Sequence, residues 1–161
     1  ITGLIDVVYN KGINTVIILD NSITGMTGHQ DNPTTGKTIR GEATKQVDLE
    51  LLCKAVGIDR VRIVDPFDVK AMEAAVKEEV AADEASVIIA QRPCALLKYV
   101  KYGGHCQIDE HACRNCRVCM KLGCPALTIR EGHVVVDTTQ CNGCGLCINV
   151  CPFQAIRKEE P

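Results

Sequence analysis

Nine of the eleven cysteines in this 161-residue chain lie in one stretch, from Cys106 to Cys151. Their total is odd, and no export signal of a basic segment followed by an apolar one is visible at the start of the sequence. Both observations argue against a secreted disulfide framework. Thiols gathered in this way are typical of a metal site.

Eight of these cysteines form two copies of one motif. The first copy is Cys113-x2-Cys116-x2-Cys119-x4-Cys124-Pro125, with four residues before its last cysteine where three is usual. The second copy, 28 residues later (141 − 113), is Cys141-x2-Cys144-x2-Cys147-x3-Cys151-Pro152. Three cysteines at two-residue gaps wrap a loop around one iron–sulfur cubane, whereas zinc sites use two separated pairs. The pattern therefore predicts two [4Fe–4S] clusters.

The fourth cysteine of each copy is expected to bind the cluster of the other copy, as in bacterial two-cluster ferredoxins. The first cluster would then be held by Cys113, Cys116, Cys119 and Cys151. The second would be held by Cys141, Cys144, Cys147 and Cys124. Cys106 lies outside both copies, and we expect it to be a buried or spare thiol.

The first hundred residues alternate helix-like and strand-like segments, which predicts an α/β domain with a parallel sheet. Helices are predicted over 1–11, 48–56 and 68–82, and strands over 14–19, 60–64 and 86–90. The first strand is nearly all apolar, which favours a strand covered on both faces. The charges between Glu73 and Glu84 are expected to form a solvated helix face.

The composition changes near Tyr102-Gly103-Gly104, where short segments, glycines and cysteines begin to dominate. We therefore expect a partial α/β domain over residues 1–102. A small α+β domain of the two-[4Fe–4S] ferredoxin type should follow over residues 103–161. A region this small needs an inorganic staple, because it has little room for an apolar core.

A long polar stretch rich in glycine and threonine follows the first strand, from Asp20 to Gly41. Ligands bind outside the carboxyl ends of strands in open parallel sheets. Asn and Thr oxygens at this place suit Mg²⁺ bridging a diphosphate. Gly36-Lys37-Thr38 is similar to the end of a P-loop, but Asp31 stands where that motif needs glycine, so we reject nucleotide hydrolysis. From the residues alone, a diphosphate site and a solvated surface loop stay equally open.

The segment Thr2–Gln30, ending in Leu-Asp-Asn-Ser-Ile-Thr-Gly-Met-Thr-Gly-His-Gln, resembles the second half of the thiamine-diphosphate motif of the 2-oxoacid:ferredoxin oxidoreductases. The cysteine motifs and Gln91-Arg92-Pro93-Cys94 extend the resemblance over the whole chain, toward the members that act on indolepyruvate. The resemblance implies that Mg²⁺ is held by Asn21 and the Ile23 carbonyl. It implies that the thiamine diphosphate site includes Asn21, Ile23, Thr24, Gly25, Met26 and Thr27.

The Gly-Asp half of that motif would precede Ile1, so we expect a C-terminal piece of a longer enzyme, inactive alone and without an identifiable catalytic residue. The implied reaction is oxidative decarboxylation of indolepyruvate or another aryl pyruvate to the acyl-CoA, with electrons passing through the two clusters to ferredoxin. The expected partners are a β subunit of the oxidoreductase, ferredoxin, coenzyme A and the oxoacid, and the expected location is cytoplasmic.

Two other functions stay open. Another 2-oxoacid, such as pyruvate or a branched-chain acid, is an alternative substrate. A non-catalytic electron-transfer module is an alternative of a different class. The net charge is −2 with both signs interspersed, and no apolar run approaches a membrane span, so we expect neither nucleic acid nor a membrane as partner.

Overall fold

The computed structural model describes residues 1–159, which form two compact units. The first unit is Ile1–Cys94 and the second begins at Ala95. The domain boundary expected from the sequence, at 102–103, falls within the stretch 92–105, which contains no helix or strand. None of the helices in residues 1–159 has the length and apolar character needed to cross a membrane.

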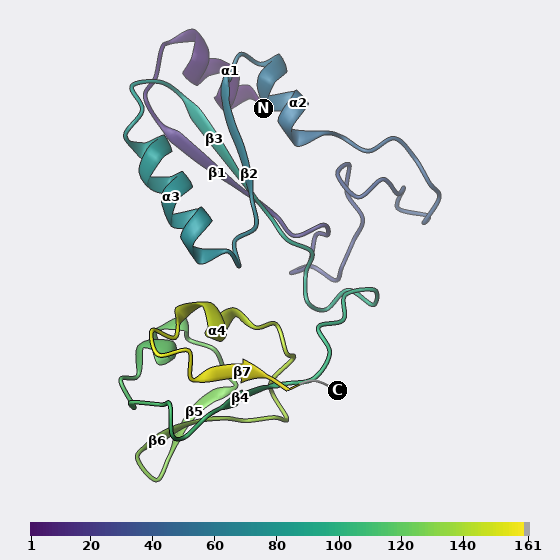
Figure 1. Ribbon diagram of the computed structural model, residues 1–161. Helices are drawn as coiled ribbons and strands as arrows, with labels where there is room; N and C mark the ends of the chain where they lie inside the picture. The colour runs from purple at the N-terminus through teal and green to yellow at the C-terminus, as the bar shows by residue number, and fades with distance from the viewer. Residues whose placement is uncertain (160–161) are drawn as a thin grey trace. The chain divides into compact units, whose positions relative to one another are not determined.

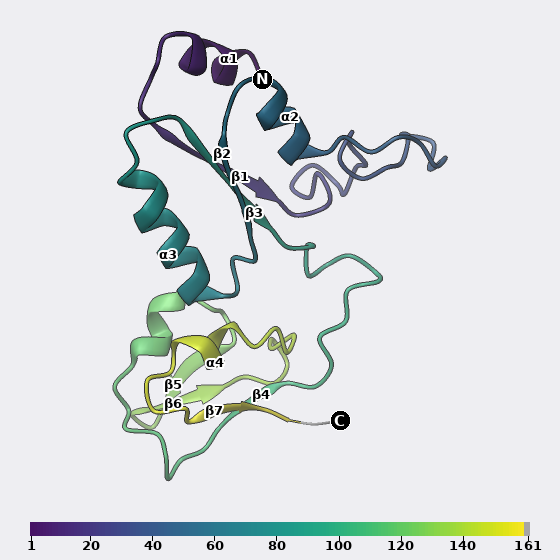
Figure 2. The ribbon, with the colours of Figure 1, turned by 45° about the horizontal axis from the view of Figure 1, so that its top comes forward.

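The first unit is built on a three-stranded parallel sheet with the strand order β1-β3-β2 (Figures 1 and 2). Its strands are β1 (Thr15–Asp20), β2 (Arg60–Val64) and β3 (Ser86–Gln91). Its helices are α1 (Thr2–Tyr9), α2 (Leu49–Ala55) and α3 (Val69–Val80). The predicted α/β class and the parallel sheet are confirmed.

Two aspartates fix where the later helices begin. The Asp48 carboxylate accepts a hydrogen bond from the Leu51 N–H, and the Asp68 carboxylate accepts one from the Ala71 N–H. Each carboxylate thereby satisfies a backbone N–H of the first helical turn, which has no hydrogen-bond partner within the helix. The chain therefore leaves the polar loop and enters α2 at a defined residue.

Helices cover both faces of this sheet. The apolar core on one face includes Cys53 and Val87, packed against Leu4 and Val8 from α1. On the other face α3 packs against β2 and β3, and Ala75 is buried there. Cys53 is therefore a core residue, as its place in the helix pattern predicts.

Two expectations about exposure are wrong. The side chains of Ile17 and Leu19 on β1 are 43% and 79% exposed, because α3 packs over β2 and β3 and leaves the neighbouring edge strand open. Glu79 is only 1% exposed, although the helix charges around it are solvated. Its carboxylate turns inward because Arg60 and Arg62 donate hydrogen bonds to it, at 2.8 and 2.6 Å from their Nε atoms.

The second unit contains two small antiparallel sheets and two short helices. One sheet pairs β4 (Cys106–Ile108) with β7 (Ile156–Lys158), and the other pairs β5 (Leu127–Arg130) with β6 (His133–Val136). The helices are η1 (Val118–Leu122) and α4 (Leu146–Val150). The buried core consists of Cys106, Leu127, Val134, Cys147 and Ile156. The small α+β architecture is as expected.

Candidate functional site

The two cysteine motifs begin with the same hydrogen-bonded turn. Asp109 and Asp137 each stand four residues before the first cysteine of a copy (113 − 109 and 141 − 137). The main-chain oxygen of each accepts a hydrogen bond from that cysteine, at 2.9 and 3.0 Å. Each carboxylate accepts two more hydrogen bonds from the turn itself, and these hold the pKa of both carboxyls below their usual value.

The beginning of each copy is also bonded to the end of the other. The Asp109 N–H donates to the Ala155 carbonyl at 2.8 Å, and the Asp137 N–H donates to the Ala126 carbonyl at 2.7 Å. Ala155 follows the last cysteine of the second copy, and Ala126 follows the last cysteine of the first. The backbone therefore interlocks the two copies crosswise.

The eight motif cysteines line two separate cavities, four to each. A narrow cavity of about 20 Å³ has among its lining residues Cys113, Cys116, Cys119 and Cys151. A cavity of about 230 Å³ has among its lining residues Cys141, Cys144, Cys147 and Cys124. Each set combines three thiols of one copy with the last thiol of the other, a donor set that fits a [4Fe–4S] cluster. Within residues 1–159, no three His, Cys, Asp or Glu side chains converge closely enough to hold a single metal ion.

Backbone N–H groups point at several of these sulfurs. Asn115 donates to the Cys113 Sγ at 3.4 Å and Ala155 donates to the Cys151 Sγ at 3.3 Å. Such hydrogen bonds stabilise negative charge on sulfur. Burial raises the pKa of the Cys119 and Cys147 thiols. Binding of a metal cluster would therefore release protons from these thiols.

A fifth cysteine, Cys106, also lines the second cavity and is 1% exposed. Its N–H donates to the Cys141 Sγ at 3.4 Å. The sequence predicts a buried or spare thiol at Cys106, and the thiol is buried, but its place beside the second set was not predicted. It stands on β4, outside the repeat, so no spacing pattern could place it there.

We predict that Cys106→Ala leaves the iron content of the chain unchanged, because four other thiols of the second cavity remain. Its backbone N–H, which bonds Cys141, is also kept. The measurement is iron and sulfide analysis of the anaerobically reconstituted chain, with Cys144→Ala as the matched variant that should lose one cluster. A loss of iron in Cys106→Ala equal to that in Cys144→Ala would make Cys106 a ligand.

At the other candidate site, the chain leaves β1 directly into Asn21. The Asn21 carboxamide oxygen accepts a hydrogen bond from the Ile23 N–H at 3.2 Å. Its main-chain oxygen accepts one from the Cys94 N–H at 2.9 Å, which ties the segments after β1 and β3 together. Asn21 is exposed, so its side chain is open to a ligand.

The residues after Asn21 form a closed loop. Thr24 and Gln30 exchange two backbone hydrogen bonds of 3.0 and 3.2 Å, and the chain between them turns back on itself. Gly25 lies beside Asn21, because a Cβ on Gly25 would stand 3.6 Å from the Asn21 Nδ2 atom. Met26 is fully exposed. The structure thus brings Gly25 back to Asn21, while Met26 and Thr27 stand on the outer, exposed part of the loop.

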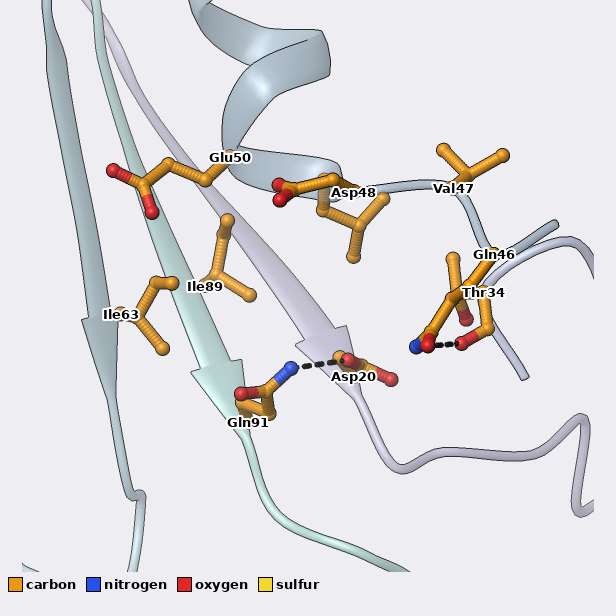
Figure 3. A pocket seen from close by; sticks show the side chains of 10 residues that line it. Asp20, Thr34, Gln46, Val47, Asp48, Glu50, Ile63, Ile89 and Gln91 are labelled. Atoms are coloured by element: carbon orange, nitrogen blue, oxygen red, sulfur yellow. Dashed lines mark hydrogen bonds between the residues drawn. The ribbon is translucent and has the colours of Figure 1, made fainter. Parts of the chain in front are cut away.

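A cavity of about 390 Å³ adjoins this loop at the carboxyl ends of the strands (Figure 3). Asp20 and Gln91, the last residues of β1 and β3, meet there through a hydrogen bond of 2.8 Å from the Gln91 amide. Asp48 and Glu50 add two more carboxylates to the lining. None of the six residues predicted to bind thiamine diphosphate is among the residues that line this cavity. A cavity at the carboxyl ends of the strands could have been expected from the sequence. The contribution of Leu49 and Glu50 of α2 to its lining could not be inferred.

Comparisons with known proteins agree with these two units. Residues 1–90 match the family described as thiamine pyrophosphate enzyme, C-terminal TPP binding domain, and residues 134–157 match the 4Fe-4S binding domain. The chain therefore belongs to the thiamine pyrophosphate enzymes that carry this C-terminal domain. The thiamine diphosphate and [4Fe–4S] cofactors predicted from the sequence are those of the two matching families.

Among individual proteins, the chain is similar to the indolepyruvate oxidoreductase subunit IorA of Pyrococcus abyssi, with 36% identity over 165 residues and 97% of this chain. It is also similar to IorA of Archaeoglobus fulgidus, with 37% identity over 167 residues and 98% of this chain. The chain spans about a quarter of the length of these relatives, 25% and 26%. A shorter similarity, 38% over 52 residues, joins 32% of this chain to 62% of the pyruvate synthase subunit PorD of Methanothermobacter marburgensis.

Proposed function

We propose that this chain supplies the electron relay and part of the thiamine diphosphate site of a 2-oxoacid:ferredoxin oxidoreductase that acts on indolepyruvate or related aryl pyruvates. The observation that carries the proposal is the joining, in one chain, of a thiamine-diphosphate-binding domain to two sets of four cysteines. Thiamine diphosphate supplies carbanion stabilisation when bound, and iron–sulfur clusters carry single electrons. A β subunit, coenzyme A and an external ferredoxin complete the reaction.

In this proposal, Asn21 and the Ile23 carbonyl hold Mg²⁺ and thereby the diphosphate. Two observations support the assignment. Within residues 1–159, no hydrogen bond reaches the Ile23 carbonyl oxygen, so it is free to coordinate a hard cation. The adjoining cavity carries the carboxylates of Asp20 and Glu50, which repel phosphate, so the diphosphate is not expected to occupy that cavity.

The proposed cluster ligands are the two crossed sets. One is Cys113, Cys116, Cys119 and Cys151, and the other is Cys141, Cys144, Cys147 and Cys124. The two cavities and the crosswise backbone hydrogen bonds support this division. The indolepyruvate names of the IorA relatives support the choice of substrate, and pyruvate is the alternative suggested by the PorD similarity.

We expect Asn21→Ala in the complete enzyme to weaken thiamine diphosphate binding at least tenfold, because Mg²⁺ loses one of its few protein oxygens. Calorimetric titration with thiamine diphosphate and Mg²⁺ measures this loss. The matched control is Asn10→Ala, which removes an exposed asparagine at the end of α1. Equal affinity in the two variants would contradict the assignment of Asn21.

The same enzyme tests the overall function. Reduction of ferredoxin should depend on indolepyruvate and coenzyme A, and should be slower with pyruvate or a branched-chain oxoacid. An enzyme with both clusters assembled but no reduction with any 2-oxoacid would favour the non-catalytic electron-transfer module.

A further inference from the structure

The two cysteine loops carry different charges at equivalent positions. Arg114 and Arg117 of the first copy correspond to Asn142 and Gly145 of the second, because the copies are offset by 28 residues (142 − 114 and 145 − 117). The loop of the first copy therefore carries two positive side chains that the loop of the second lacks.

The backbones of the two loops match, so the difference lies in the side chains. Asn115 and Arg117 have φ values of +51° and +60°, and their counterparts Gly143 and Gly145 have φ values of +71° and +78°. Both loops thus use two left-handed residues in the same places. Arg117 adopts a left-handed conformation that glycine favours, so a side chain at that position carries a conformational cost that Gly145 avoids.

Both arginines line the cavity of the first set, and they are the only charged residues that do so within residues 1–159. The described lining of the second cavity contains no charged residue. Within the same part of the chain, neither Arg114 nor Arg117 forms an ion pair. No carboxylate of residues 1–159 therefore neutralises their positive charge.

Hydrogen bonds to sulfur differ in the same direction. Two sulfurs of the first set, those of Cys113 and Cys151, accept a backbone N–H. In the second set, the backbone N–H of Cys106, which lies outside the repeat, donates to the Cys141 Sγ. Net charge and hydrogen bonds to sulfur are two of the factors that set the potential of an iron–sulfur cluster. Positive side chains near a cluster and N–H groups that donate to its sulfurs both stabilise the reduced state, because that state carries more negative charge.

We propose that the two clusters are unequal, and that the cluster bound by Cys113, Cys116, Cys119 and Cys151 has the higher reduction potential. The inference rests on the proposed cluster ligation. One electron added to the oxidised chain reduces this cluster from the 2+ to the 1+ state and leaves the second cluster oxidised. An electron that arrives on the second cluster passes to the first, so that one is oxidised as the other is reduced.

The test is a potentiometric titration of the full chain with both clusters, followed by electron paramagnetic resonance. In Arg114→Asn/Arg117→Gly, which gives the first loop the residues of the second, the higher of the two potentials should fall. We expect the ratio of reduced to oxidised cluster at a fixed potential to drop about tenfold, which corresponds to about 59 mV for one electron. The glycine suits the left-handed backbone, so the variant is compatible with the fold.

Two further variants test whether the shift depends on positive charge beside the cluster: the reverse substitution in the second loop, and a control outside both cavities. Asn142→Arg, at an exposed position, should raise the lower potential and leave the higher one unchanged. Lys101→Gln removes an exposed positive charge that lines neither cavity and should shift neither potential.

Iron analysis separates the two hypotheses on which the experiment depends. Chains that fail to bind about eight irons contradict the proposed ligation. A different result contradicts the inference about unequal clusters. In that case the chains bind about eight irons, but Arg114→Asn/Arg117→Gly either shifts only the lower of the two potentials or shifts neither potential.

Discussion

Replacing Cys124 and Cys141 together by alanine is expected to remove no more iron than replacing either one alone. Both thiols line the second cavity, so the first substitution already costs that cluster a ligand and the second has no further cluster to destroy. About four of the eight irons should remain in all three variants. By contrast, Cys124→Ala combined with Cys119→Ala should remove nearly all the iron, because these thiols line different cavities.

The two double variants distinguish crossed from uncrossed ligation. If each copy held its own cluster, Cys119 and Cys124 would share a cluster, and the two outcomes would exchange places. On the proposed crossed ligation, we expect the unit to stay folded in the single-cluster variants, because either cluster alone would still tie both copies together. Cys53→Ala, in the core of the first unit, is the control that should keep all the iron. Iron and sulfide analysis of the reconstituted chain is the measurement.

Local patterns in the sequence predicted the features that depend on local chemistry. The spacing of the cysteines implied two crossed sets, and the structure gathers the same sets around two cavities. The helices that begin at Asp48 and Asp68 and the three strands of the parallel sheet were also predicted from local patterns. Each of these signals involves residues within a few positions of one another, where periodicity and capping are strong guides.

Features that depend on packing between distant segments could not be predicted. Asp20, Glu50 and Gln91 meet in one cavity only after α2 and the strands are assembled. Cys106 reaches the second set through the pairing of β4 with β7, the last strand of the chain. Glu79 has the sequence context of an exposed helix residue, and its burial depends on two arginines of β2.

The second large expected effect is a loss of stability when the buried Glu79 carboxylate loses its two arginine partners. Arg60→Met/Arg62→Met removes both cations and leaves the Glu79 carboxylate buried without a charged partner. At pH 7 an unpaired buried charge of this kind costs about 3–5 kcal/mol of unfolding free energy. Urea unfolding of the full chain, followed by circular dichroism, measures the loss. The control is Glu78→Gln, because the Glu78 side chain is 53% exposed and its ion pairs should contribute at most about 1 kcal/mol.

The pH dependence should change sign between the two proteins. In the natural chain, burial favours the neutral acid, but hydrogen bonds from Arg60 and Arg62 outweigh it and hold the pKa of Glu79 below its usual value. Its contribution to stability is therefore present above the unfolded pKa of about 4.3, and is lost as the pH falls through the lower folded pKa. In the double variant only burial remains, so the pKa of Glu79 should lie above its unfolded value. That variant should then regain stability as the pH is lowered from 7 toward 5, relative to the natural chain. A constant difference between the two proteins over this range would show that Glu79 turns to water once its arginines are gone, and that the ion pairs, not the packing of α3, keep it buried.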